Sequence, residues 1–252
     1  MVNPEVHILG VTGLREVVPG DDLSALIAQA IGKLSYRIGA GDVIVVAQKV
    51  VSKAEGRIVR LDTIEPSIHS RHWAQTYDQK DPRLIEVILN ESRRIVRMDR
   101  GVLITETHHG FVCANAGVDA SNCPPGVVTL LPENTDESAN RLRDKLEKVF
   151  GVPLSVIISD SFGRPWREGQ VNCALGISGV SPVTDYRGQR DAFERVLQGT
   201  LIAVADELAA AAELVMGKTR RVPVAIVQGF QGAGPPGTAS SLIRNPESDL
   251  FR

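Results

Sequence analysis

The sequence has few aromatic residues, few cysteines and no excess of charge of either sign. Aromatic side chains make up only 4% of the 252 residues, so the stacking platforms that bind single-stranded nucleic acid are not evident. A net charge of −2 gives no indication of nucleic-acid binding. The three cysteines lack CxxC spacing, which favours a reduced compartment and therefore a cytoplasmic location.

The sequence also lacks the segments that direct proteins into or across membranes. The first seven residues, MVNPEVH, have neither the basic nor the apolar region of a signal peptide. No apolar run approaches the ~20 residues that a membrane span needs. The hydrophobic content of 43% is typical of a globular protein, and we expect residues 1–252 to form a single domain, as one unit or as two lobes.

Hydrophobic periodicity predicts an α+β fold with mixed and antiparallel sheets and flanking helices. Predicted helices begin after Asp21 or Asp22 as the cap, at Asp81-Pro82, at Thr135-Asp136 and at Leu201. The second of these is expected to continue through Ile95 and Val96 to a cluster of arginines. Strands are predicted at residues 6–11, 42–48, 101–107, 111–115, 127–131, 154–158, 170–178 and 222–227.

Residues 154–169 carry the densest group of chemically useful side chains. The apolar run Val156-Ile157-Ile158 predicts a buried strand, which we expect to stop at Asp160-Ser161. A carboxylate and a hydroxyl at a strand end suit Mg²⁺ or Mn²⁺, and the following Arg164 and Arg167 suit a phosphate or a carboxylate. The alternative is a helix-capping aspartate followed by a solvated basic loop.

A second basic group follows the strand at residues 42–48. Lys49 and Lys53 are four residues apart, so on a helical turn they share a face and repel each other unless an anion lies between them. A polyphosphate would fill that role, although the Walker A pattern is absent and a solvated basic turn is the alternative. Further along, Asp119 lies in a turn-forming stretch, where it is either a turn residue or a second metal carboxylate.

Six motifs occur together in an order that resembles the coenzyme F420-0:γ-glutamyl ligase family. They extend over nearly the whole chain: GVTGLREV (10–17), SKAEGR (52–57), NAGVDASN (115–122), SDSFGRPWR (159–167), LVMGK (214–218) and SLIR (241–244). The resemblance implies an α+β fold that is neither P-loop nor ATP-grasp and that forms an intertwined homodimer. Because the sequence ends near residue 252, we expect no C-terminal nitroreductase-like domain.

The activity implied by this resemblance is GTP-dependent amide formation. The terminal carboxylate of the F420-0 deazaflavin precursor is phosphorylated by GTP, the amine of L-glutamate attacks the acyl phosphate, and further γ-linked glutamates are added. The resemblance also implies two sites for Mg²⁺ or Mn²⁺, which the reaction needs, and a K⁺ ion that assists it.

The implied site residues follow from the matching motifs. Metal-binding positions are Asp119, Asp160 and Ser161. Positions implied to contact GTP are Leu14, Arg15, Glu16, Val17, Gln48, Lys53, Asn122, Met216, Gly217 and Lys218. Our own hypothesis adds Arg164 and Arg167 as catalytic residues that stabilise transferring charge or hold the substrate phosphodiester.

Two other functions fit the same residues. One is a GTP-dependent ligase or kinase of the same architecture that acts on another carboxylic acid. The other is a non-catalytic protein that binds a nucleotide or a deazaflavin, which would release neither GDP nor phosphate.

Overall fold

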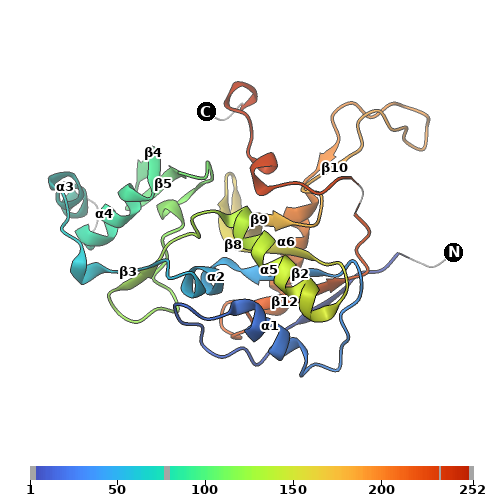
Figure 1. Ribbon diagram of the computed structural model, residues 1–252. Coiled ribbons are helices and arrows are strands. Elements are labelled where there is room, and N and C mark those ends of the chain that lie inside the picture. The colour runs from blue at the N-terminus through green and yellow to red at the C-terminus, as the bar shows by residue number, and fades with distance from the viewer. Residues whose placement is uncertain (1–3, 77–79, 233, 250–252) are drawn as a thin grey trace.

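A five-stranded sheet forms the centre of the computed structural model, which describes residues 4–76, 80–232 and 234–249 (Figure 1). Its strand order is β1-β12-β2-β8-β9. The strands are β1 (His7–Gly10), β12 (Val224–Gln228), β2 (Val43–Ala47), β8 (Ser155–Arg164) and β9 (Arg167–Ser178). Neighbouring strands are antiparallel except for the parallel pair β2 and β8.

Helices cover both faces of this sheet. The helices α1 (Leu23–Ile31), α2 (Gln48–Ala54) and α5 (Thr135–Phe150) bury one apolar cluster, which includes Ile44, Val156 and Ile158. The opposite face packs against α6 (Val204–Met216) through Val45, Ile157 and Val227. Because β2, β8 and β12 are covered on both faces, their sequences are continuous apolar runs rather than alternating patterns.

A second group of elements has its own apolar cluster, centred on Ile85, Leu103 and Val128. Its helices are α3 (Ile68–Thr76) and α4 (Pro82–Asn90). Its strands form a pair, β3 (Ile58–Arg60) with β7 (Val127–Thr129), and a sheet of β4 (Ser92–Asp99), β5 (Val102–Thr107) and β6 (Val112–Ala114). The mixed α+β class predicted from the sequence is therefore confirmed, with several separate sheets.

Short elements complete the chain. The strands β10 (Thr184–Asp185) and β11 (Leu201–Ile202) form the base of an arm that projects from the body (Figure 1). The 3-10 turns in the described part of the chain are η1 (Leu61–Thr63), η2 (Asn115–Gly117), η3 (Ala239–Leu242) and η4 (Pro246–Ser248). After β12 the chain is described as far as Asp249, with Ala233 and the last three residues outside the described part. None of the helices in the described residues is both long and apolar enough to cross a membrane.

The predicted helix from Asp81 is too long. It ends at Asn90, where the Ser92 hydroxyl donates a hydrogen bond to the Ile88 carbonyl. The residues after it form β4, which pairs with β5 through a turn at Arg100, so Ile95 and Val96 lie on a strand and are 41% exposed. The prediction that these arginines cluster at a helix end is consequently wrong, because they lie on β4.

Three smaller predictions also need correction. Asn134, not Thr135 or Asp136, caps α5. The helix expected from Leu201 begins at Val204, because residues 201–202 form β11. The strand expected to stop at Asp160 continues to Arg164, since β9 pairs with it along its whole length.

Candidate active site

A cleft of about 910 Å³ opens where the parallel strands β2 and β8 lie side by side. Ala47 at the end of β2 pairs with Ser159 of β8, so α2 and the polar half of β8 begin at the same edge of the sheet. The carboxyl ends of parallel strands are a common position for ligand sites, because the loops and helices that follow them converge there. The other wall is the turn at residues 119–124, which a β-bridge between Asp119 and Thr129 anchors to the second group of elements.

Most of the residues singled out from the sequence line this one cleft. They are Leu14, Arg15, Glu16, Val17, Gln48, Lys53, Asp119, Asn122, Asp160, Ser161, Met216, Gly217 and Lys218. Five separate segments of the chain supply them, and the fold brings these segments together. Whether each residue has its predicted role stays a prediction.

Arg164 and Arg167 are placed elsewhere. They face each other across the turn at the tip of the β8–β9 hairpin and are not among the residues that line the cleft. The Arg164 guanidinium donates to the carbonyls of Glu168 and Gly169, which closes the hairpin turn. Their position outside the cleft therefore does not support the hypothesis that they are catalytic residues.

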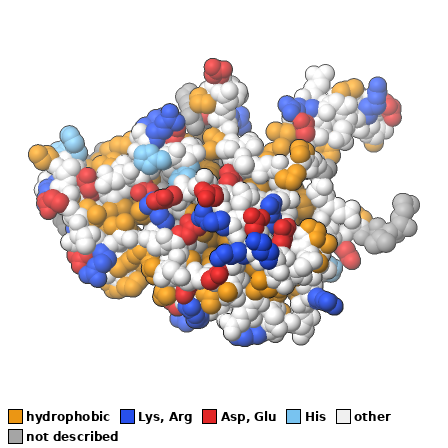
Figure 2. All heavy atoms as spheres, viewed as in Figure 1, with side chains coloured by type: hydrophobic (Ala, Val, Ile, Leu, Met, Phe, Trp, Pro, Cys, Tyr) orange, Lys and Arg blue, Asp and Glu red, His pale blue; other side chains and the backbone are white. Residues whose placement is uncertain are grey.

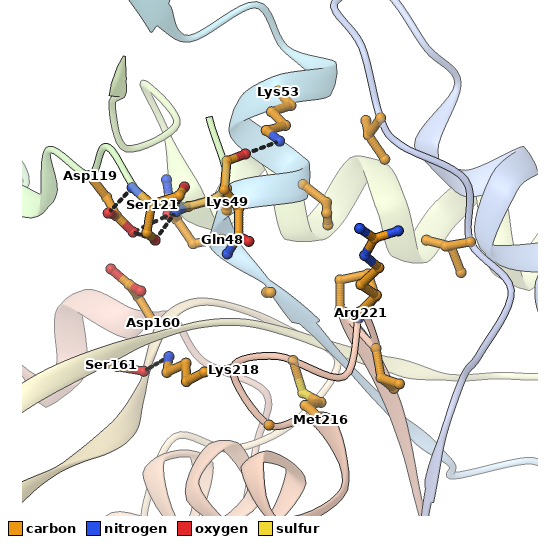
Figure 3. Close-up of a pocket in the computed structure, with 18 of the residues that line it drawn as sticks. Gln48, Lys49, Lys53, Asp119, Ser121, Asp160, Ser161, Met216, Lys218 and Arg221 are labelled. Atoms are coloured by element: carbon orange, nitrogen blue, oxygen red, sulfur yellow. Dashed lines mark hydrogen bonds and ion pairs between the residues drawn. The ribbon is translucent and has the colours of Figure 1, made fainter. Parts of the chain in front are cut away.

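Asp119 and Asp160 point toward each other across the cleft (Figure 3). Burial raises the pKa of Asp160 to about 6, and the nearby charge of Asp119 acts in the same direction. Burial also acts on Asp119, but hydrogen bonds from Lys49 and Ser121 outweigh it and hold its pKa below the ordinary value. The charge of Asp119 thus acts on Asp160 across the cleft that both residues line.

Lysine side chains occupy both sides of this carboxylate pair. The Lys49 ammonium lies 2.5 Å from Asp119 Oδ2, and the Lys218 ammonium donates to the hydroxyl of Ser161 (Figure 3). Ser161 in turn donates to Asn172 Oδ1 at 2.5 Å. Lys53 likewise pairs with an acidic residue, Glu16, whose Oε1 lies 2.5 Å from its ammonium. The binding of an anion between Lys49 and Lys53 stays a prediction.

Hydrogen bonds and an ion pair hold Gln48 and the segment 14–17 in place at the rim of the cleft. The Gln48 amide donates to the Leu130 carbonyl and to Ser52, which ties α2 to the segment after β7. Arg15 forms a bidentate ion pair with Asp21, at 2.7 Å for each contact. These contacts fix the backbone of both segments at the rim of the cleft.

Sequence reasoning missed several residues of the cleft. Arg221 has a left-handed backbone conformation and lines the cleft together with Asn172 and Glu213, which share a hydrogen bond of 3.1 Å. Ser159 also lines it, and its buried hydroxyl has no hydrogen-bond partner within the described part of the chain. The basic run at residues 218–221 was a usable signal for Arg221, whereas nothing local distinguishes Asn172 or Glu213.

The donor atoms suit a hard divalent cation that arrives with a phosphate ligand. Within residues 4–76, 80–232 and 234–249, no group of three or more His, Cys, Asp or Glu side chains could hold a metal ion by itself. Two carboxylates and a hydroxyl are nevertheless the usual protein contribution to Mg²⁺, whose other ligands are water and substrate phosphates. The cations Lys53, Lys218 and Arg221 in the same cleft provide charge for such an anion.

The comparisons with known proteins agree with one another. A family model described as F420-0:Gamma-glutamyl ligase matches residues 13–229. A coenzyme F420:L-glutamate ligase of Methanopyrus kandleri is 47% identical, over 99% of this chain and 98% of its own length. Proteins with the same name from Methanothermobacter thermautotrophicus and Methanocaldococcus jannaschii are 44% and 45% identical, over 98% and 92% of this chain and 99% and 90% of theirs.

Proposed function

The chain belongs to the F420-0:γ-glutamyl ligase family, and we propose that it joins L-glutamate to F420-0 in the biosynthesis of coenzyme F420. One observation carries the proposal beyond family membership. Two carboxylates and at least three cationic side chains from distant parts of the sequence meet in a single cleft of about 910 Å³. A site of this kind suits a metal-bound nucleotide and an acidic substrate.

We propose that GTP drives the reaction through an acyl phosphate. An oxygen of the F420-0 carboxylate attacks the γ-phosphorus, and the bond to the β-phosphate oxygen breaks to release GDP. The amine of L-glutamate then attacks the acyl carbon, loses a proton and expels inorganic phosphate, which leaves an amide. Repetition at the γ-carboxylate of the added residue gives the γ-linked chain.

Asp119, Asp160 and Ser161 are the residues proposed to hold Mg²⁺ or Mn²⁺ at two sites. When bound, the metal would neutralise charge on the phosphates during transfer. Lys53 and Lys218 add fixed positive charge beside the same oxygens, and the neighbouring segments 14–17 and 216–218 with Gln48 and Asn122 would enclose the nucleotide. Such positioning and charge neutralisation are the main contributions that a protein makes to phosphoryl transfer.

Arg164 and Arg167 keep a proposed role only under one condition. They lie at the hairpin tip, so they would act on a part of the substrate that extends out of the cleft, such as its phosphodiester. Full activity of both Arg164→Ala and Arg167→Ala would remove them from the site.

The remaining parts of the proposal concern the conditions of the reaction. K⁺ is expected to assist it, and the protein is expected to work as a homodimer in the cytoplasm. The partners are then GTP, L-glutamate and F420-0.

Mass spectrometry of the deazaflavin product tests the proposal. Wild-type protein is incubated with F420-0, L-glutamate, GTP, Mn²⁺ and K⁺, and a mass gain of one or more glutamyl units is expected. Asp160→Asn should lose this gain, because the substitution removes a metal carboxylate while keeping the side-chain shape. Replacing GTP with ATP tests the nucleotide, and no mass gain with any nucleotide would contradict the ligase function.

A further inference from the structure

Three oxygen atoms at the candidate metal site accept hydrogen bonds from the Lys49 ammonium. The ammonium lies 2.5 Å from Asp119 Oδ2 and 2.6 Å from Ser121 Oγ, and it also donates to the Ser121 carbonyl (Figure 3). These three acceptors use all three N–H donors of the lysine. Only 16% of the Lys49 side chain is exposed, against 43% of the Asp119 side chain, so the lysine is held in the wall of the cleft while the carboxylate stays accessible.

The same oxygens are the ones that a divalent cation would use. Carboxylate, hydroxyl and carbonyl oxygens are the preferred ligands of Mg²⁺ and Mn²⁺. An ammonium and a divalent cation cannot both contact Asp119 Oδ2 closely, because two positive charges a few ångströms apart repel strongly in a partly buried site. One must leave when the other binds.

Asp160 lacks such a partner. Among the described residues, no lysine or arginine forms a hydrogen bond or an ion pair with its carboxylate, which faces Asp119 across the cleft (Figure 3). The pair is therefore asymmetric, with one carboxylate covered by Lys49 and one left for an incoming cation.

We propose that Lys49 is an internal counter-ion that the divalent cation displaces from Asp119, and that the released ammonium then contacts the phosphates of the nucleotide. This inference rests on the proposed function, since it takes a metal-bound nucleotide as the ligand. Lys49 and Lys53 lie four residues apart on α2, and both line the cleft. A change of rotamer on the flexible four-carbon side chain can thus move the ammonium to a new partner while the backbone stays in place.

The exchange makes metal and nucleotide bind cooperatively. The metal frees Lys49 for the nucleotide, and the nucleotide draws Lys49 away from Asp119 and so raises the affinity for the metal. Such coupling is reciprocal by thermodynamic necessity. It is a property that a purely structural ion pair between Lys49 and Asp119 would not give.

The test measures Mn²⁺ binding from the electron paramagnetic resonance signal of free Mn²⁺, with and without GDP. In Lys49→Met, Mn²⁺ alone should bind at least about 5-fold more tightly than in wild type, because its competitor is gone. GDP binding in the presence of Mn²⁺ should weaken in the same variant, and the cooperativity should largely disappear. Lys49→Gln, which keeps polar contacts without the charge, should change both affinities in the same directions.

Lys53→Met is the matched control. It removes the same charge from the same helix and the same cleft, but Lys53 pairs with Glu16 and with the Asn122 carbonyl, away from the carboxylate pair. It should weaken GDP binding and leave the affinity for Mn²⁺ alone within about 2-fold of wild type, since no competitor at Asp119 has been removed. Thermal unfolding of each variant shows that it is folded.

Three results would overturn the exchange. One is an unchanged or weaker affinity of both Lys49 variants for Mn²⁺ alone. Another is equal tightening in the Lys49 and Lys53 variants, which would indicate only the general charge of the cleft. The third is the absence of Mn²⁺ binding to any of the proteins, with or without GDP; the mass-spectrometric assay without added metal then decides the ligase function separately.

Discussion

Asp119 and Asp160 are the same residue type in two different electrostatic environments. Lys49 and Ser121 keep the pKa of Asp119 low against the effect of burial, whereas burial raises the pKa of Asp160 to about 6. The difference comes from hydrogen bonds that only Asp119 receives from side chains. An incoming cation would therefore meet one carboxylate that is already compensated and one that gains from being compensated.

The sequence predicted the residue types of this site better than their contacts. Asp119 and Asp160 were both singled out, but Lys49 was expected to share an anion with Lys53. Its actual partner Asp119 is 70 residues away along the chain. Local spacing predicts which side chains share a helical face, and it carries no information about a partner that tertiary packing brings to that face.

Asp22 offers a prediction at the scale of one residue. Its carboxylate caps α1 by accepting from the Ala25 amide, and it also accepts from Ser24 Oγ at 2.5 Å and pairs with Lys145. The hydrogen bond from Ser24 is the largest cause that lowers the pKa of Asp22 to about 2, followed by Lys145. Asp22→Ala should reduce the free energy of unfolding by about 1 kcal/mol at pH 7, the usual effect of losing a cap.

The effect of this substitution should depend on pH in a defined direction. A carboxyl group whose folded pKa is lowered stabilises the protein above its unfolded pKa of about 3.9, and this contribution is lost as the pH falls toward 2. Urea unfolding at pH 7 and at pH 3 should show a smaller difference between wild type and Asp22→Ala at pH 3. Asp22→Asn, which still caps but lacks the charge that pairs with Lys145, should lie between wild type and Asp22→Ala at pH 7. A difference for Asp22→Ala that grows in acid would contradict the assignment.

At the scale of whole elements, apolar runs predicted the strands more reliably than periodicity predicted the helix after Pro82. The apolar runs at β2, β8 and β12 are buried on both faces of the sheet, as continuous runs of this kind predict. The pattern around Ile95 and Val96 also fitted a helix, because it continued the spacing of α4. Pairing with β5 decided the outcome, and pairing between strands is a property that a local pattern does not contain.

Gly176 is the point where β9 passes closest to the start of α5. A Cβ atom at this position would lie 2.2 Å from the Thr135 carbonyl oxygen, far inside van der Waals contact with backbone. Gly176→Ala should therefore force β9 and α5 apart and lower the free energy of unfolding by about 3 kcal/mol.

Gly163 provides the control on the same hairpin. A Cβ added there would meet nothing within 4 Å, so Gly163→Ala should unfold within about 0.5 kcal/mol of wild type. Chemical denaturation of both variants measures the two effects under identical conditions. Equal stability of the Gly176 and Gly163 variants would contradict the close approach of β9 to α5.

At the scale of the whole molecule, the cleft could not have been predicted from the sequence. Its residues come from the segment after β1, from α2, from the turn after η2, from β8 and from the end of α6. Motif resemblance named most of them as a group, but the geometry depends on the parallel pairing of β2 with β8. A motif match alone does not place a residue in the cleft. Arg164 and Arg167 belong to the same motif as Asp160, yet they lie at the tip of the β8–β9 hairpin, outside the cleft.

Exposed apolar side chains outside the cleft include those on β4 and on the projecting arm. The edge strand β4 exposes Ile95, Val96 and Met98 by 39–41%, and Phe193 on the projecting arm is 84% exposed. Figure 2 shows apolar side chains gathered where the arm leaves the body. Exposed apolar edge strands normally pair or are covered, since they otherwise promote aggregation. A second copy of the chain is the proposed cover.

Light scattering after size-exclusion chromatography should therefore give a mass of about twice the 27.2 kDa of the chain. The double substitution Val96→Lys and Met98→Lys should shift the protein toward the monomer, because two charges on an edge strand oppose its burial against a partner. Val149→Lys, at a 60% exposed position on α5, is the control and should leave the mass unchanged. A wild-type protein that elutes as a single chain at micromolar concentration would contradict the homodimer, and β4 would then be an edge that its arginines alone protect.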